Sequence, residues 1–156
     1  MCLLSTMIKK YFRRFFMPRV KLKELLEYEY SIELPIRIYD LNYGRHVGNA
    51  EFINLIHEAR VQLLQSEGLS EFNLGDNITG IIMSDIQVNY KIELFINETI
   101  VIDSHVDEVS DTSFRIYHRV KRNGEVAALV ETGFVGYDYR KSAVVPLPES
   151  FKKLYA

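Results

Sequence analysis

The pattern of apolar and polar positions predicts one long helix set among several strands. Between residues 52 and 64, apolar side chains recur every three or four positions, which is the spacing of a helix with a buried face. The apolar positions are Phe52, Ile53, Leu55, Ile56, Ala59, Leu63 and Leu64. The polar positions on the opposite arc are Glu51, Asn54, Glu58, Gln62 and Gln65. We therefore expect a largely enclosed helix with one polar face, ending at Gly68.

The segments before and after this helix alternate as strands do. Residues 30–39 alternate, and Pro35 indicates an edge strand or a bulge, because proline cannot donate to a strand ladder. Further strands are expected over residues 78–94, 99–109, 113–122 and 125–141. Asn123-Gly124 is typical of a type I′ hairpin, and Pro148 of the start of a short C-terminal helix. The fold class is therefore α+β, in the order strand, helix, four strands.

Composition limits the possible classes. A chain of 156 residues with 47% hydrophobic and 26% charged side chains is the size and composition of one globular domain. Its one cysteine, Cys2, excludes an internal disulfide and favours a reducing, cytoplasmic location. No apolar run reaches the ~18 residues of a membrane span. Neither Cys-x-x-Cys nor His-Glu-x-x-His occurs, so no metal site and no cofactor are expected.

The charge is unevenly distributed. Residues 1–23 hold seven of the 19 Lys and Arg residues and no acid, whereas the rest of the chain holds all 21 acids and is too acidic for a general nucleic-acid binder. Residues 1–16 have the pattern of a basic amphipathic helix. Such a helix can contact a membrane surface, target an organelle or pack on its own domain, or translation can begin at Met17. We expect an extension over residues 1–28 and one domain over 29–156.

The candidate chemistry lies just before the long helix. Residues 40–49 are rich in polar side chains and glycine and lead directly into its first turn. Gly44 and Gly48 allow the backbone to approach a ligand closely. The first amides of a helix have no partner inside it and favour negative charge, so a developing oxyanion could bind there.

This segment resembles a known family. The runs are Asp40-Leu41-Asn42, His46-Val47-Gly48-Asn49-Ala50 and His57-Glu58-Ala59-Arg60. Together they resemble the 4-hydroxybenzoyl-CoA thioesterase-like acyl-CoA thioesterases, which commonly carry D-x-D-x-x-G-H-V-N-N-A before a helix with E-A-R. The order of elements fits over residues 30–151, but only residues 40–60 are specific. The resemblance implies one hotdog domain, an antiparallel sheet wrapped around the helix, which acts as a homodimer or tetramer with its sites between protomers.

The resemblance also implies hydrolysis of acyl-CoA or acyl carrier protein thioesters without a cofactor. In that family, catalysis is usually attributed to the second acid of the D-x-D pair. The corresponding position in this sequence is Asn42, and an amide has no useful basicity. From the resemblance we expect Asp40 and His46 to be the acid and base groups, with Asn42 and Asn49 in positioning roles and Glu58 as the other candidate base. Substrate contacts are expected from Tyr43, Gly44, Arg45, Val47, Gly48, Asn49 and Tyr90.

Structural roles compete with each of these assignments. Asp40 can cap a turn, His46 can hold the loop, and Asn49 can be the helix N-cap. Glu58 can neutralise Arg60 or Arg45 in a buried pair, and Tyr90 can simply pack in its strand. The remaining histidines lack ligand spacing and are expected at the surface or an interface: His57, His105 and His118. The rival function is a non-catalytic acyl-thioester-binding module that has lost its base at Asn42.

Overall fold

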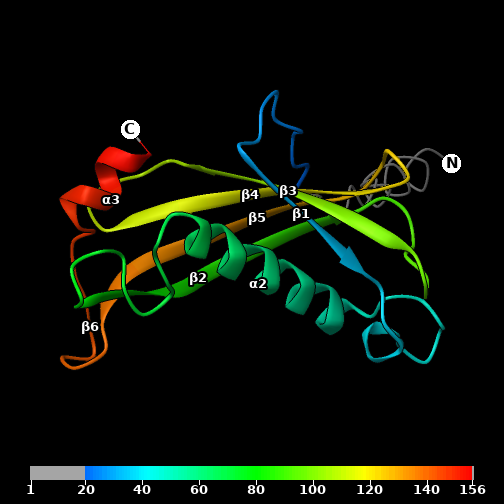
Figure 1. The fold of residues 1–156 in the computed structure, drawn as a ribbon, viewed down its shortest axis with the longest axis horizontal. Helices are drawn as coiled ribbons and strands as arrows, with labels where there is room; N and C mark the ends of the chain where they lie inside the picture. Colours follow the sequence, from blue (N-terminus) through cyan, green and yellow to red (C-terminus); the bar gives the residue numbers. More distant parts are fainter. Residues whose placement is uncertain (1–19, 156) are drawn as a thin grey trace, which may run out of the picture.

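One antiparallel sheet and one main helix make up the fold (Figure 1). The computed structural model describes residues 20–155, so residues 1–16 lie outside the described part. The elements are β1 (Tyr30–Pro35), η1 (Ile38–Asp40), α2 (Asn49–Ser66), β2 (Thr79–Tyr90), β3 (Thr99–Asp107), β4 (Ser113–Arg122), β5 (Glu125–Asp138), β6 (Ala143–Val144) and α3 (Glu149–Leu154). The strand order is β1-β3-β4-β5-β2, with β6 paired to β5. None of the described helices is long and apolar enough to cross a bilayer.

The core lies between α2 and one face of the sheet. The buried side chains of α2 follow the predicted stripe, and they pack on inward-facing residues of β3, β4 and β5. Figure 1 shows α2 running along this face, with α3 at one end of the sheet and the loop before α2 at the other. The α+β arrangement predicted from the sequence is confirmed, and α2 delivers its N-terminus to the loop end of the molecule.

β1 and β2 end four residues earlier than their alternation predicts, while β3 and β5 end two and three residues early, at Asp107 and Asp138. β1 stops at Pro35 and is an edge strand, as expected; η1 then follows. β2 stops at Tyr90 instead of Leu94, because the N–H groups of Lys91 and Ile92 both donate to the carbonyl of Ala127. The ladder cannot continue from this shared acceptor. Residues 91–98 therefore form an irregular segment next to the loop before α2.

The tight hairpin is confirmed. Asn123 and Gly124 both have positive φ, 50° and 81°, and they connect β4 to β5. This is the backbone that a type I′ turn requires. The local sequence thus sets where β4 and β5 begin to pair, at Arg122 and Glu125.

The segment before β1 crosses the outer face of the sheet, opposite α2. Its residues 20–28 bind β2 and β4: the Asn89 side chain donates to the carbonyl of Val20, and Arg119 pairs with Glu24 and lies over the ring of Tyr28. The part of the extension that the structure describes therefore packs on the domain, without helical structure.

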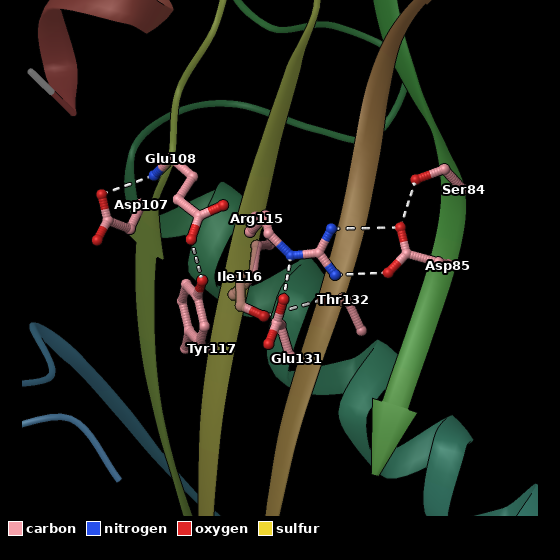
Figure 2. Close-up of polar contacts among 9 residues, drawn as sticks. All are labelled: Ser84, Asp85, Asp107, Glu108, Arg115, Ile116, Tyr117, Glu131 and Thr132. Atoms are coloured by element: carbon pink, nitrogen blue, oxygen red, sulfur yellow. Dashed lines mark hydrogen bonds and ion pairs between the residues drawn. The ribbon is translucent and has the colours of Figure 1, made fainter. Parts of the chain in front are cut away.

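An ion network covers the outer face beyond this segment. Figure 2 shows Arg115 of β4 reaching across β5 to Asp85 on β2, while its Nε faces Glu131 of β5. The path crosses Gly133, where a Cβ would collide with the Arg115, Asp85 and Ser84 side chains. Glycine at position 133 therefore leaves the space in which Arg115 of β4 and Asp85 of β2 form their ion pair.

Candidate active site

The loop before α2 is anchored on residues 91–98. Ile36 N–H donates to the Glu98 carbonyl, and Val47 N–H donates to the Leu94 carbonyl. These bonds tie the chain on both sides of the polar tip to residues 91–98. The irregular segment that begins where β2 ends is thus a wall of the site.

Asp40 is a structural residue in this geometry. Its buried carboxylate accepts hydrogen bonds from the backbone N–H of Arg37 at 2.7 Å and from the Arg37 guanidinium at 3.2 and 3.1 Å. Burial alone would raise the pKa of Asp40, but these bonds outweigh it and the pKa lies below its ordinary value. Its backbone carbonyl accepts the N–H of Gly48. Asp40 therefore braces the loop and the start of α2.

Asn42, Gly44 and His46 form a closed turn. The Asn42 N–H donates to the His46 carbonyl, and the Gly44 N–H donates to Asn42 Oδ1 at 2.7 Å. Asn42 Nδ2 lies 3.1 Å from His46 Nε2. A Cβ on Gly44 would lie 2.8 Å from His46 Cε1, so glycine is what lets the imidazole fold back over the turn. All three residues belong to the polar segment 40–49 that the sequence singles out.

The helix begins one residue earlier than expected. Gly48 is the N-cap of α2 and Asn49 is its first helical residue, so the prediction that Asn49 caps the helix is wrong. The capping position has extended backbone angles and no side-chain cap. The first amides of α2 therefore have no side-chain cap, although the Glu51 side chain folds back beside Gly48.

A largely apolar cavity of about 290 Å³ opens at this helix start. It is lined by His46, Val47, Asn49, Phe52, Tyr90, Lys91, Ile92, Glu93 and Leu94. Four of the predicted site residues therefore meet here: His46, Val47, Asn49 and Tyr90. The Tyr90 ring packs edge-on against Phe52 at 5.0 Å between ring centroids, so it both packs and forms a wall of the cavity.

The other predicted residues lie around the cavity or away from it. Tyr43 and Arg45 are exposed on the loop tip, and Arg45 has a positive φ of 65°. Glu58 borders a separate hollow with Arg37 and accepts a hydrogen bond from Gln62. The alternative that Glu58 pairs with Arg60 or Arg45 is wrong, because Arg60 binds Glu71 and Glu58 forms no ion pair among the described residues.

Glu93 is the site residue that sequence reasoning missed. It was assigned to the polar face of a strand that in fact ends at Tyr90. Its carboxylate lies 3.6 Å from His46 Nδ1, and its side chain is 65% exposed at the cavity. Only the break in the ladder after Tyr90 directs Glu93 toward the loop, and the sequence carries no local signal of that break.

The remaining histidines are not part of this site. His57 and His105 each face a glutamate, whereas His118 is fully buried with its Nδ1 on Ser104, so its expected surface location is wrong. Burial, with the Arg60 charge, lowers the pKa of His118 to about 3, so it is neutral. Among residues 20–155, no three histidine, cysteine or acidic side chains gather in a way that could hold a metal ion.

Comparison with known proteins identifies the family. The family model of the thioesterase-like superfamily matches residues 36–154, which is most of the chain, so the chain belongs to this family. No curated protein matches the sequence.

Solved structures share the fold at low identity. A gentisyl-coenzyme A thioesterase is 21% identical with a TM-score of 0.73 and covers 81% of this chain and 100% of its own. A 1,4-dihydroxy-2-naphthoyl-CoA thioesterase from Synechocystis is 17% identical with a TM-score of 0.71, covering 79% and 92%. A hypothetical protein from Aquifex aeolicus is 16% identical with a TM-score of 0.74, covering 81% and 99%. The predicted hotdog fold is confirmed.

Proposed function

We propose that this protein hydrolyses acyl thioesters of coenzyme A or of acyl carrier protein. One observation carries the proposal: in a member of the thioesterase-like family, an apolar cavity opens at the uncapped N-terminus of α2, beside a polar loop. An apolar chamber suits an acyl group, and free helix amides suit the oxyanion of acyl transfer.

The reaction needs three features, and the described residues supply candidates for each. The acyl group would enter between Phe52, Tyr90 and Ile92. The thioester oxygen would face the N–H groups of Asn49 and its neighbour in the first turn, where the helix dipole favours negative charge. Water would attack the carbonyl carbon from the side of the loop, and the thiol would leave. No cofactor takes part.

Two cations near the cavity could bind the phosphates of coenzyme A or the acidic surface of a carrier protein. Lys91 lines the cavity and Arg45 lies on the loop tip. Neither has a carboxylate partner among the described residues. Their positive charge is therefore free to meet an anionic ligand.

We also propose a homodimer, or a tetramer built from dimers. β2 is a twelve-residue edge strand whose second side is unpaired in the described chain, and Ile82, Met83 and Tyr90 are partly exposed along it. A long open edge with apolar side chains favours pairing with another strand. Light scattering after size exclusion measures the mass; a monomer at micromolar concentration would contradict this proposal.

The function is tested by a thiol-release assay on purified full-length protein. Acetyl-, octanoyl-, palmitoyl- and benzoyl-CoA would be incubated with the protein, and free thiol measured with Ellman's reagent. We expect thiol release that saturates with rising concentration of at least one of these substrates and that is proportional to protein concentration. Phe52→Trp, which fills the cavity, is expected to raise KM for that substrate, and the distant Phe72→Trp is the matched control. No release from any thioester would contradict the proposal.

The second candidate function is binding without hydrolysis. Asn42 favours it, because this position carries a carboxylate in the family that the sequence resembles. Calorimetric titration with the same acyl-CoA panel separates the two. Tight binding of an intact thioester with no thiol release would support the binding module.

A further inference from the structure

Asn42 fixes the tautomer of the neighbouring imidazole. Because Asn42 Oδ1 accepts the Gly44 N–H, the side-chain amide presents Nδ2–H to His46 Nε2. That ring nitrogen must then be the acceptor, so the proton of neutral His46 is on Nδ1. His46 Nδ1 faces the Glu93 carboxylate at 3.6 Å. The loop therefore presents an N–H donor to Glu93.

Glu93 is the carboxylate best placed to act on the contents of the cavity. Among residues 20–155, its side chain has no direct hydrogen bond, and its one ion-pair contact is His46. Its backbone is held, because Arg122 donates to the Glu93 carbonyl at 2.9 Å. A held backbone and an unoccupied carboxylate at a cavity are what a general base requires.

The other nearby carboxylates are less suitable. Asp40 is occupied by Arg37 and does not line the cavity. Glu58 borders a different hollow. Glu51 folds back over the backbone of Gly48 and is not a cavity-lining residue. Glu93 is the acid that meets both conditions, contact with the cavity and an uncommitted carboxylate.

We propose that Glu93 is the general base of the reaction, replacing the carboxylate that Asn42 lacks, and that His46 is its positioning residue. This inference rests on the proposed thioester hydrolysis. Glu93 takes a proton from water as the water oxygen bonds to the thioester carbon, and the α2 amides stabilise the oxyanion. The carbon–sulfur bond then breaks, and the leaving thiolate takes the proton from the Glu93 carboxyl group. The products are the carboxylic acid and the thiol.

The test compares Glu93→Gln with the wild type in the thiol-release assay over pH 4–9. We expect kcat/KM at neutral pH to fall by about 10²–10⁴-fold, with KM nearly unchanged. The rise of kcat/KM with pH that an ionising base produces should also disappear. Three charged or titratable groups lie near Glu93 and remain in the variant: His46 faces its carboxylate, Lys91 lines the same cavity, and Arg122 of β4 binds its backbone carbonyl. Glu93→Asp should recover part of the rate.

Glu29→Gln is the matched control. Glu29 is also 65% exposed and also faces a histidine Nδ1, that of His105, but it lies away from the cavity. We expect the control to keep the wild-type rate and pH profile. Circular dichroism and thermal unfolding should show that all variants fold, since both glutamates are exposed.

The outcomes separate the two proposals. Wild-type hydrolysis with an unchanged rate and pH profile in Glu93→Gln would overturn the role of Glu93 and leave the proposed function standing. An equal loss in Glu29→Gln would also overturn it, since the effect would then not be specific to the cavity. Absence of hydrolysis by the wild type would overturn both.

Discussion

Charged side chains gather in two regions, the outer face of the sheet and the cavity at the head of α2, and their partners differ. On the outer face, carboxylates and cations neutralise one another: Arg115 holds Asp85 and Glu131, and Asp103 receives Arg119 and Lys121. At the cavity, in the described residues, cations lack carboxylate partners and a glutamate has only a loose histidine contact. Matched charges stabilise a fold; unmatched charges beside an apolar hollow are available to a ligand.

The largest effect that would test this contrast is on activity. His46→Ala removes the imidazole that faces the Glu93 carboxylate at 3.6 Å, and a misplaced base costs about 10²-fold in rate. We expect kcat/KM for thioester hydrolysis to fall by about that factor, while the free energy of unfolding changes by less than about 0.5 kcal/mol because the ring is partly exposed. Denaturant unfolding and the thiol assay measure the two quantities. His105→Ala is the control, and a comparable rate loss there would remove the contrast.

The outer-face network should show the reverse. Arg115→Leu removes the cation that Asp85 and Glu131 share, so we expect the free energy of unfolding to fall by about 1–3 kcal/mol. The rate per folded molecule should stay near the wild-type value. Urea unfolding and the thiol assay check this, with the exposed Lys153→Gln as the control. A large loss of rate without loss of stability would show that the network serves the site.

The smallest effect concerns acid stability. Burial alone would raise the pKa of Asp103, but hydrogen bonds from Lys121, Arg119 and Ser31 outweigh it and lower the pKa below its ordinary value. A carboxyl group whose pKa is lower in the folded state stabilises the fold above its unfolded pKa, near 3.9, and loses that contribution as the pH falls through the folded value.

Asp103→Asn should therefore flatten the decline of unfolding free energy as the pH falls below about 4. Urea titrations at several pH values measure the slope. Glu27→Gln, an exposed acid without an ion pair among the described residues, should leave the slope unchanged. A decline as steep in Asp103→Asn as in the wild type would contradict the role of the network.

Periodicity predicted the framework well because it depends on local geometry. The stripe from Phe52 to Leu64 fixed the buried face of α2, and Asn123-Gly124 fixed the hairpin. The edge position of β1 followed from Pro35 in the same way. Each of these is set by a residue's own backbone or by neighbours within a few positions.

The site was less predictable because its partners come from distant segments. The motif singled out His46, which lines the cavity, but it could not reveal that Arg37 binds the Asp40 carboxylate. Nor could it reveal that Glu93, 47 positions further along the chain, faces the imidazole. The interior position of His118 was hidden for a related reason, since strand alternation does not say which face is covered. The role of Glu93 and the reaction itself stay predictions.

The crossing of residues 20–28 over the outer face bears on how the protein should be shortened. The predicted domain boundary would place the start of a minimal version at residue 29, just before β1. That cut would remove two partners of Arg119, the Glu24 carboxylate and the Tyr28 ring. It would also remove the hydrogen bond from Asn89 to Val20, and Asn89 directly precedes Tyr90 of the cavity. A truncated version that keeps both sheet and cavity intact should start at Val20 or earlier.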